Sequence, residues 1–153
     1  MTEGERAGQD AGARVLPDRT GYLLVKLGEA INAQAEHALA PLGLRGKHLH
    51  VLTLASQQRL SQQELAELIG MDRTSMVGVI DELERLGLAT RQRDEADRRR
   101  YLIVPTEEAQ DALRRSTEVL DAAEGQLFDE LSPAESELLS AIVTRLLTRI
   151  HER

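Results

Sequence analysis

The strongest constraint on the fold is a series of helix start and stop signals between Ser61 and Gly87. Ser61 followed by Glu64 forms a capping box, in which the hydroxyl and the carboxylate each bond a backbone N–H at the start of a helix. Gly70 ends that helix, Asp72 is an N-cap for the next one, and Gly87 supplies a left-handed stop. A short helix, a tight turn containing glycine and a second helix are typical of a helix-turn-helix.

Two extended segments follow these helices and complete a second motif. The segments are "LATRQR" (88–93) and "RYLIVP" (100–105), and in the second Tyr101 and Ile103 alternate with Leu102 and Val104. This alternation favours a strand, and the charged stretch "DEADRR" joins the two segments as the tip of a hairpin. A hairpin directly after a helix-turn-helix is the arrangement of a winged helix. We therefore predict a mainly α protein with a small β-hairpin wing, the winged helix-turn-helix covering about 45–105.

Helices are expected on both sides of this segment. Apolar residues recur at helical spacing over 18–40 and again over 45–57. Thr106 can cap a helix that runs to about 130. Ser132, Pro133 and Glu135 then supply three agreeing start signals for a last helix that ends near 152. Residues 1–17 have little to bury and are interpreted as a flexible tail, which leaves one domain over 18–153.

Composition excludes several classes of function. The chain has 153 residues, no cysteine and only 2% aromatic residues, so thiol chemistry, thiolate metal sites and base stacking on aromatic side chains are not expected. No apolar run approaches the roughly 20 residues that span a bilayer, and no signal-peptide core begins the chain. A cytoplasmic location is expected. No paired acids, nucleophile–base set or phosphate-cradling glycine loop appears, so we predict no enzyme, no cofactor and no metal.

Residues 49 to 110 resemble the MarR (multiple-antibiotic-resistance regulator) family of bacterial transcription factors. The matching residues are "LSQQELAELIGMDRTSMVGVIDELERLGLATRQRDEADRRRYLIVPTEEA". The most specific element is Asp97-Arg98-Arg99 in the hairpin. The family's usual form ends the second strand in Leu-Thr, so Pro105 is a departure that leaves the end of this strand open. The order of flanking helices extends the resemblance to about residues 18–152.

The resemblance implies a homodimer that binds a palindromic operator in double-stranded DNA, most often as a repressor. The helices over 18–40 and 106–152 would interlock with those of the partner, and a small aromatic or anionic effector would release the DNA. The apolar pattern agrees, because one chain has more apolar helix surface than a small core can cover. Packing of Leu113, Leu120 and Leu127 within the chain is the alternative.

The helix over 73–86 is the candidate for the major groove. Met76, Ile80 and Leu83 form its apolar stripe. The opposite side carries small and polar residues that can bond phosphates or base edges, with a valine for a thymine methyl group and a glycine that permits close approach. These are Arg73, Thr74, Ser75, Val77 and Gly78, with Asp81 beside them. An ordinary solvated helix face is the alternative interpretation.

Positive charge between residues 59 and 101 is concentrated in the predicted hairpin. The formal net charge of the chain is -7, and residues 59–101 hold eight arginines against nine acids, yet 91–100 hold five arginines against three acids. A narrow minor groove attracts inserted arginines. A carboxylate two residues away can hold the long arginine side chain in place. The family's Asp-x-Arg pattern implies that Asp97 orients Arg99 in this way and that Arg99 inserts.

The remaining arginines of the hairpin have less definite roles. We interpret Arg98 and Arg100 as phosphate contacts, whereas the sequence leaves the direction of Arg91 and Arg93 open. A solvated turn with surface ion pairs, each contributing about 0–1 kcal/mol, is the competing interpretation.

No effector site can be assigned from the sequence. The residues that could line a pocket are Lys26, His37, Lys47, His48 and His50. A single histidine is more often solvated or part of a core. The spacing of His48 and His50 puts them on different sides of a helix, which argues against a shared metal.

Two other functions remain open. A winged-helix dimer could serve as a protein-interaction or ligand-binding module without binding DNA, which the acidic total and the nearly neutral 59–101 segment favour. A small-molecule carrier is a weaker alternative. Affinity for duplex DNA that falls steeply with salt would separate a DNA-binding regulator from both.

Overall fold

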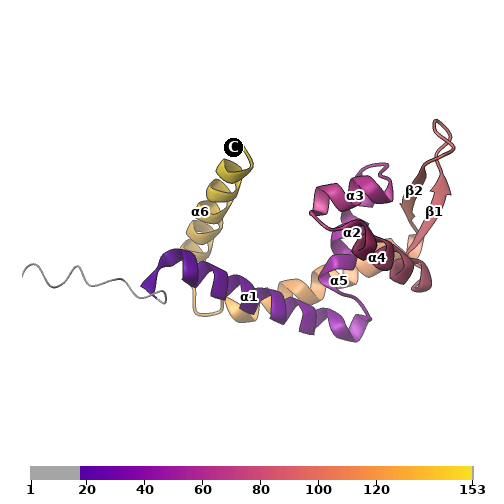
Figure 1. The fold of residues 1–153 in the computed structure, drawn as a ribbon. Coiled ribbons are helices and arrows are strands. Elements are labelled where there is room, and N and C mark those ends of the chain that lie inside the picture. Colours follow the sequence, from indigo (N-terminus) through magenta and orange to yellow (C-terminus); the bar gives the residue numbers. More distant parts are fainter. Residues whose placement is uncertain (1–17, 153) are drawn as a thin grey trace, which may run out of the picture. The chain divides into compact units, whose positions relative to one another are not determined.

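A computed structural model describes residues 18–152, so the tail predicted over 1–17 lies outside the described residues. The elements follow one another as shown in Figure 1. They are α1 (Thr20–Leu39), η3 (Ala40–Leu42), α2 (Gly46–Gln57), α3 (Gln62–Ile69), α4 (Arg73–Arg85), β1 (Ala89–Arg93), β2 (Tyr101–Pro105), α5 (Glu107–Leu127) and α6 (Pro133–His151). The mainly α fold with one β-hairpin is therefore confirmed. Within residues 18–152, no helix combines the length and apolar composition that crossing a membrane requires.

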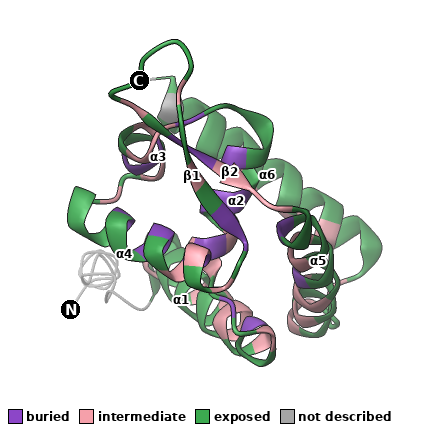
Figure 2. Cartoon of the chain, turned by 90° about the vertical axis from the view of Figure 1, so that its right-hand side faces the viewer, coloured by how far each residue is buried: buried purple, intermediate pink, exposed green. Residues whose placement is uncertain are grey.

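Contacts divide the chain into two compact units, Met1–Gln34 and Ala35–Arg153. The hydrophobic core lies in the second unit, where α2, α3, α4 and the hairpin turn their apolar sides inward (Figure 2). Its fully buried side chains come from several elements: Leu39, Val51, Leu52, Leu65, Met76, Val79, Ile80, Leu83 and Ile103. The predicted stripe of α4 is thus buried, which fixes the side of this helix that remains exposed.

Helix ends follow the sequence signals closely. Ser61 and Ser132 each take part in a reciprocal capping box, and Asp72 and Thr106 each accept a backbone N–H at the start of their helices. Gly70 and Gly87 have φ of 72°. A side chain at such a φ is strained, so glycine is needed for the tight turns after α3 and α4.

The hairpin pairs β1 and β2 antiparallel, from Ala89 opposite Pro105 to Arg93 opposite Tyr101. Pro105, which left the end of the second strand open, closes it as the last paired residue. A two-stranded hairpin is marginal by itself. The backbone N–H of Ile103 adds a bond of 2.9 Å to the carbonyl of Leu60, just before α3. The middle of β2 is therefore joined to the segment that precedes α3.

The last helix keeps much of its apolar side exposed in the chain. Leu138, Leu146 and Ile150 are 61%, 46% and 66% exposed on α6. In contrast, Leu113, Leu120 and Leu127 of α5 are half-buried. Leu113 and Leu120 pack against the core of the chain, so packing within the chain accounts for part of their burial, and their exposure does not decide between that alternative and a dimer.

Candidate nucleic-acid interface

The exposed side of α4 carries the predicted groove-facing residues. Arg73, Thr74, Ser75, Val77 and Gly78 are all exposed. A Cβ built on Gly78 would meet nothing within 4 Å, so no contact inside the chain requires glycine there. The start of α4 therefore presents a small, polar surface to solvent, with one arginine at its first position.

Asp72 organises the N-terminus of α4. Its carboxylate accepts the backbone N–H of Ser75 at 2.9 Å and the Ser75 hydroxyl at 2.6 Å. These bonds, the hydroxyl bond first, lower the pKa of Asp72. The hydroxyl proton of Ser75 is thus committed to Asp72, and the oxygen of Ser75 is left to accept hydrogen bonds from a ligand.

Two aspartates order the tip of the hairpin. The Asp94 carboxylate accepts the backbone N–H of Ala96, and the Asp97 carboxylate accepts that of Arg99, both at 3.0 Å. The Asp97 carbonyl accepts the backbone N–H of Arg100 at 2.9 Å. The tip is therefore a turn held by two of its own acids, which explains why aspartates lie among its arginines.

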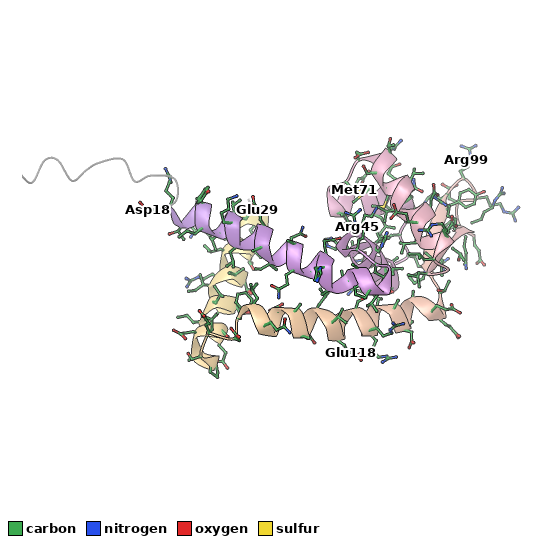
Figure 3. The ribbon with its side chains drawn as sticks, turned by 90° about the horizontal axis from the view of Figure 1, so that it is seen from below. Asp18, Glu29, Arg45, Met71, Arg99 and Glu118 are labelled. Atoms are coloured by element: carbon green, nitrogen blue, oxygen red, sulfur yellow. The ribbon has the colours of Figure 1, made fainter. Side chains whose placement is uncertain are left out.

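The arginines of the hairpin fall into two groups. Arg98 and Arg99 are exposed, and among residues 18–152 neither forms an ion pair; Figure 3 shows Arg99 pointing away from the helices at the hairpin tip. Arg100 instead bonds Glu64 of α3 at 2.7 Å. Arg91 bonds acids of α4, and the Arg93 guanidinium lies over the Tyr101 ring, 5.7 Å from its centroid. Two of these arginines are thus free for a ligand.

Asp97 acts on Arg99 through the backbone. The predicted orienting role assumed a bond between the carboxylate and the guanidinium, whereas the bond present joins the carboxylate to the Arg99 N–H. A carboxylate that accepts an N–H two residues later is a common turn geometry for aspartate. Asp97 therefore fixes where the side chain of Arg99 begins, and the guanidinium forms no ion pair among residues 18–152.

An open hollow of about 350 Å³ joins the hairpin to the two helices of the helix-turn-helix. Arg73 of α4 and Arg99 of the hairpin both line it, although the rest of α4, strand β1 and a turn lie between them in the sequence. The lining residues are Ser61, Gln62, Gln63, Arg73, Arg91, Arg99, Arg100 and Tyr101. Arg91 and Arg100 are paired with acids, so Arg73 and Arg99 are the two arginines of this hollow that remain available for an anion such as a phosphate.

Glu64, next to this hollow, both caps α3 and binds the hairpin. Its carboxylate accepts the backbone N–H and the hydroxyl of Ser61, both at 2.8 Å, and it also pairs with Arg100. The N–H bond is the largest cause of the lowered pKa of Glu64. The residue predicted only as a helix cap thus also attaches the hairpin to α3.

The histidine and lysine candidates divide between surface and core. His48 is 3% exposed; its Nδ1 accepts the Arg45 N–H at 3.1 Å, and its Nε2 lies 2.6 Å from Glu82 of α4. Lys47 also bonds Glu82 at 3.0 Å. These contacts, that from Lys47 first, lower the pKa of Glu82 to about 2. Lys47 and His48 therefore join α2 to α4.

The other three candidates lie apart from this network. Lys26 pairs with Glu29 at 2.7 Å, and His37 and His50 are exposed. Within residues 18–152, no group of three or more His, Cys, Asp or Glu residues could hold a metal ion.

Sequence reasoning missed the acidic partners of this region. Glu82 and Glu84 appear in the sequence only as charges on a helix, and the direction of Arg91 was left open. The spacing of seven between Glu84 and Arg91 carries no signal, because a turn and a change from helix to strand lie between them. Only the packing of β1 against α4 brings their side chains together.

Known proteins share both the sequence pattern and the fold. The pattern that defines the MarR family matches residues 46–101. A transcriptional regulator of the MarR family from Rhodococcus sp. RHA1 is 32% identical, with 88% of this chain and 96% of that one covered and a TM-score of 0.76. CouR from Rhodococcus jostii RHA1, solved with p-coumaroyl-CoA, is also 32% identical, with coverage of 88% and 95% and a TM-score of 0.72.

A third structure adds a DNA complex to the comparison. It is that of the transcriptional repressor CouR bound to a 23-mer DNA duplex, at 25% identity, with coverage of 86% of this chain and 94% of that one and a TM-score of 0.76. In all three the similarity extends well beyond the helix-turn-helix to the flanking helices. The winged helix, the Asp-x-Arg hairpin and this coverage together place the chain in the MarR family.

Proposed function

We propose that this protein is a sequence-specific transcriptional regulator that binds a palindromic operator as a homodimer and represses transcription. The observation that carries the proposal is the shared exposure of the polar side of α4 and of Arg98 and Arg99, which have no acidic partner among residues 18–152. The complex of CouR with a DNA duplex supports the same use of a similar fold.

The start of α4 suits the major groove of B-DNA. That groove accommodates one α-helix, and its base edges are read by side chains near the start of the helix. In the proposal Arg73 bonds a guanine or a phosphate, and the oxygens of Thr74 and Ser75 bond base edges or phosphates. Val77 contacts a thymine methyl group, and Gly78 permits close approach to the bases.

The hairpin suits the adjacent minor groove. In the proposal Arg99 inserts into the groove, Arg98 contacts phosphate, and Asp97 holds the turn from which both side chains project. Arg100 has to exchange Glu64 for a phosphate before it can contribute. We therefore expect Arg100 to matter less for affinity than Arg98 and Arg99.

The exposed apolar side of α6 supports the proposed dimer. Leu138, Leu146 and Ile150 are large and exposed in one chain, and a second copy would bury them. In the proposal α1, α5 and α6 form the dimerisation region, residues 18–40 and 106–152. Two winged helices then bind half-sites about one helical turn apart, which explains why the operator would be palindromic.

A small aromatic or anionic effector would control this geometry. The complex of CouR with p-coumaroyl-CoA, an aromatic and anionic molecule, supports this part of the proposal. An effector that binds preferentially to a form in which the two winged helices cannot meet adjacent grooves shifts the population away from DNA. The cognate effector would lower DNA affinity without competing for the arginines.

A footprint on the promoter upstream of the protein's own reading frame tests the proposal. We expect a protected palindrome whose half-sites are about one helical turn apart, and binding that falls steeply as salt increases. Adding the purified protein to transcription from that promoter should reduce the transcript. Binding that ignores both sequence and salt would contradict the proposal.

Two hairpin variants test the proposed roles. Arg99→Ala should weaken operator binding about 10- to 100-fold at fixed salt. It should leave the unfolding transition unchanged, because the side chain is exposed and forms no ion pair among residues 18–152. Asp97→Ala should also weaken binding, although it removes a negative charge. Glu95→Ala, an exposed acid in the same turn, is the matched control and should not weaken binding. Tighter binding by Asp97→Ala would mean that net charge alone decides.

The charge balance favours one alternative. Arg91 and Arg100 are neutralised by acids of the same winged helix, so the surface is less basic than the arginine count suggests. A dimeric winged helix that binds another protein, or a ligand alone, would tolerate this balance. The salt titration on duplex DNA separates the alternatives, because neither needs phosphate contacts.

A further inference from the structure

Arg91 links the hairpin to both helices of the helix-turn-helix. Its guanidinium donates from Nη2 to Asp81 of α4 at 2.7 Å and to Gln62 of α3 at 3.3 Å. From Nη1 it donates to the carboxylate of Glu84, and the same carboxylate accepts the Arg91 backbone N–H at 3.1 Å. One residue of β1 thus contacts three side chains on two helices.

This clamp attaches β1 to α4, against which the strand packs. Strand β2 is bonded to the segment before α3 through the Ile103 N–H and the Leu60 carbonyl, at 2.9 Å. Strand β1 lies on the other side of the hairpin, next to α4. The side chain of Arg91 is 26% exposed, and that of Glu84 is 34% exposed, so solvent screens their contact only in part. The guanidinium fork can hold several oxygens in fixed directions, whereas an ammonium group cannot.

We propose that Arg91 is a positioning residue that fixes the direction of the hairpin relative to α4, so that the helix and the hairpin can enter adjacent grooves together. The inference rests on the proposed DNA-binding function and adds a role for a residue that does not itself contact DNA. Its guanidinium is occupied by Asp81 and Glu84, which leaves no free fork for a phosphate.

A positioning role for Arg91 predicts a different effect of Glu84→Ala on DNA affinity from the one that net charge alone predicts. Removing an acid from a DNA-binding surface normally strengthens binding, because it reduces repulsion of the phosphates. If Glu84 holds Arg91, however, Glu84→Ala should weaken binding about tenfold. Glu95→Ala removes the same charge from the hairpin without touching the clamp and should bind as tightly as the unaltered protein, or more tightly.

The first measurement is made on the protein without DNA. Because the chain has no cysteine, Ala96→Cys gives a single spin-label site at the exposed hairpin tip. The label should become more mobile when Arg91→Met, Glu84→Ala or Asp81→Asn is added. Arg85→Met, which removes an equal charge from an exposed position on α4, should leave the mobility unchanged. Asp81 is 59% exposed, so Asp81→Asn keeps the test valid if Arg91→Met fails to fold.

The second measurement is a double-mutant cycle on operator DNA. When the hairpin is correctly directed, Arg99→Ala removes its groove contact and costs affinity. With Arg91→Met already present, that cost should fall at least about threefold, because the hairpin is no longer held in the groove. Protection of the minor groove from hydroxyl radicals should weaken in Arg91→Met, whereas protection of guanine N7 in the major groove from methylation should remain.

Arg91→Lys decides between charge and geometry. It keeps the charge and cannot form the three-way fork, so we expect it to resemble Arg91→Met in label mobility and in the cycle. A lysine variant that matches the unaltered protein in both measurements would overturn the inference. So would tighter binding by Glu84→Ala, or a label that stays immobile in all three clamp variants.

The two levels of proposal can fail separately. If the unaltered protein shows no salt-dependent binding to any duplex, the proposed function is wrong, whereas the label still reports whether Arg91 holds the hairpin. If the operator is bound and the cycle gives no coupling between positions 91 and 99, the proposed regulatory function stands and the positioning role of Arg91 is wrong.

Discussion

Helices α4 and α6 share the same sequence pattern but differ in how far their apolar residues are buried. Each begins with a side-chain cap and carries large apolar residues at helical spacing. In α4 the apolar residues Met76 and Ile80 are fully buried, whereas in α6 Leu138 and Ile150 are more than half exposed. An apolar stripe predicts that a helix will be covered, and it does not say whether its own chain or a second copy covers it.

The largest effect is expected where α4 meets the core. Ile80→Ala removes a fully buried side chain from the packing of α2, α3 and α4. It should lower the free energy of unfolding by about 2–5 kcal/mol, because the cavity adds to the lost transfer energy. Urea unfolding measures this loss. A cost below about 1 kcal/mol would mean that the core of the winged helix repacks freely, which close packing argues against.

The equivalent change on α6 should act on assembly. Leu146 is 46% exposed in the chain, and Leu146→Asp places a charge where the proposed partner helix would lie. We expect the dimer to be weakened by about 2 kcal/mol or more, with circular dichroism of the winged helix unchanged. Sedimentation over a range of concentrations measures the shift.

Leu68 is the matched control for this experiment. It is 59% exposed on α3, so Leu68→Asp makes the same chemical change away from the proposed dimerisation region. It should leave the oligomeric state as it is. If both variants dissociated the dimer, or if neither did, the proposal that α6 and not α3 forms the dimer interface would be contradicted.

A smaller and pH-dependent effect is expected from Glu82, which closes α4 against α2. The bonds from Lys47 and His48 lower its pKa from 4.5 to about 2. A carboxyl whose pKa is lower in the folded state stabilises the fold above its unfolded pKa, and this stabilisation is lost as the pH falls through about 2.

Glu82→Gln should therefore cost about 1 kcal/mol at neutral pH, since its side chain is partly exposed and solvent screens the pairing. Unfolding by urea at neutral pH and again near the folded pKa should give a difference that disappears in acid. Glu67→Gln, an exposed acid whose partner is the neutral Gln63, is the control and should show little difference at either pH. A cost that is independent of pH would assign the role of Glu82 to packing.

Local features of this fold could be predicted, and long-range pairings could not. The caps at Ser61 and Asp72 depend on residues within one helical turn, so spacing alone identified them. The bond from Asp97 to the Arg99 N–H is equally local, and turn chemistry would have favoured it over a bond to the guanidinium. The sites at Arg91 and His48 depend on which acids the packing of α4 presents. Nine acids lie between residues 59 and 101, and their spacing does not distinguish among them.

The smallest effect separates the stability of α4 from its use. Gly78 lies in the helix interior with an ordinary φ, and a Cβ would meet nothing within 4 Å. Gly78→Ala should raise the free energy of unfolding by up to about 1 kcal/mol, because alanine loses less conformational entropy in a helix. If this side of α4 lies close to the bases, the same methyl group should weaken operator binding a few-fold. Gly125→Ala in α5, where a Cβ is equally unhindered, should stabilise the chain and leave DNA affinity unchanged. Equal DNA affinity in both variants would mean that α4 does not approach the groove at Gly78.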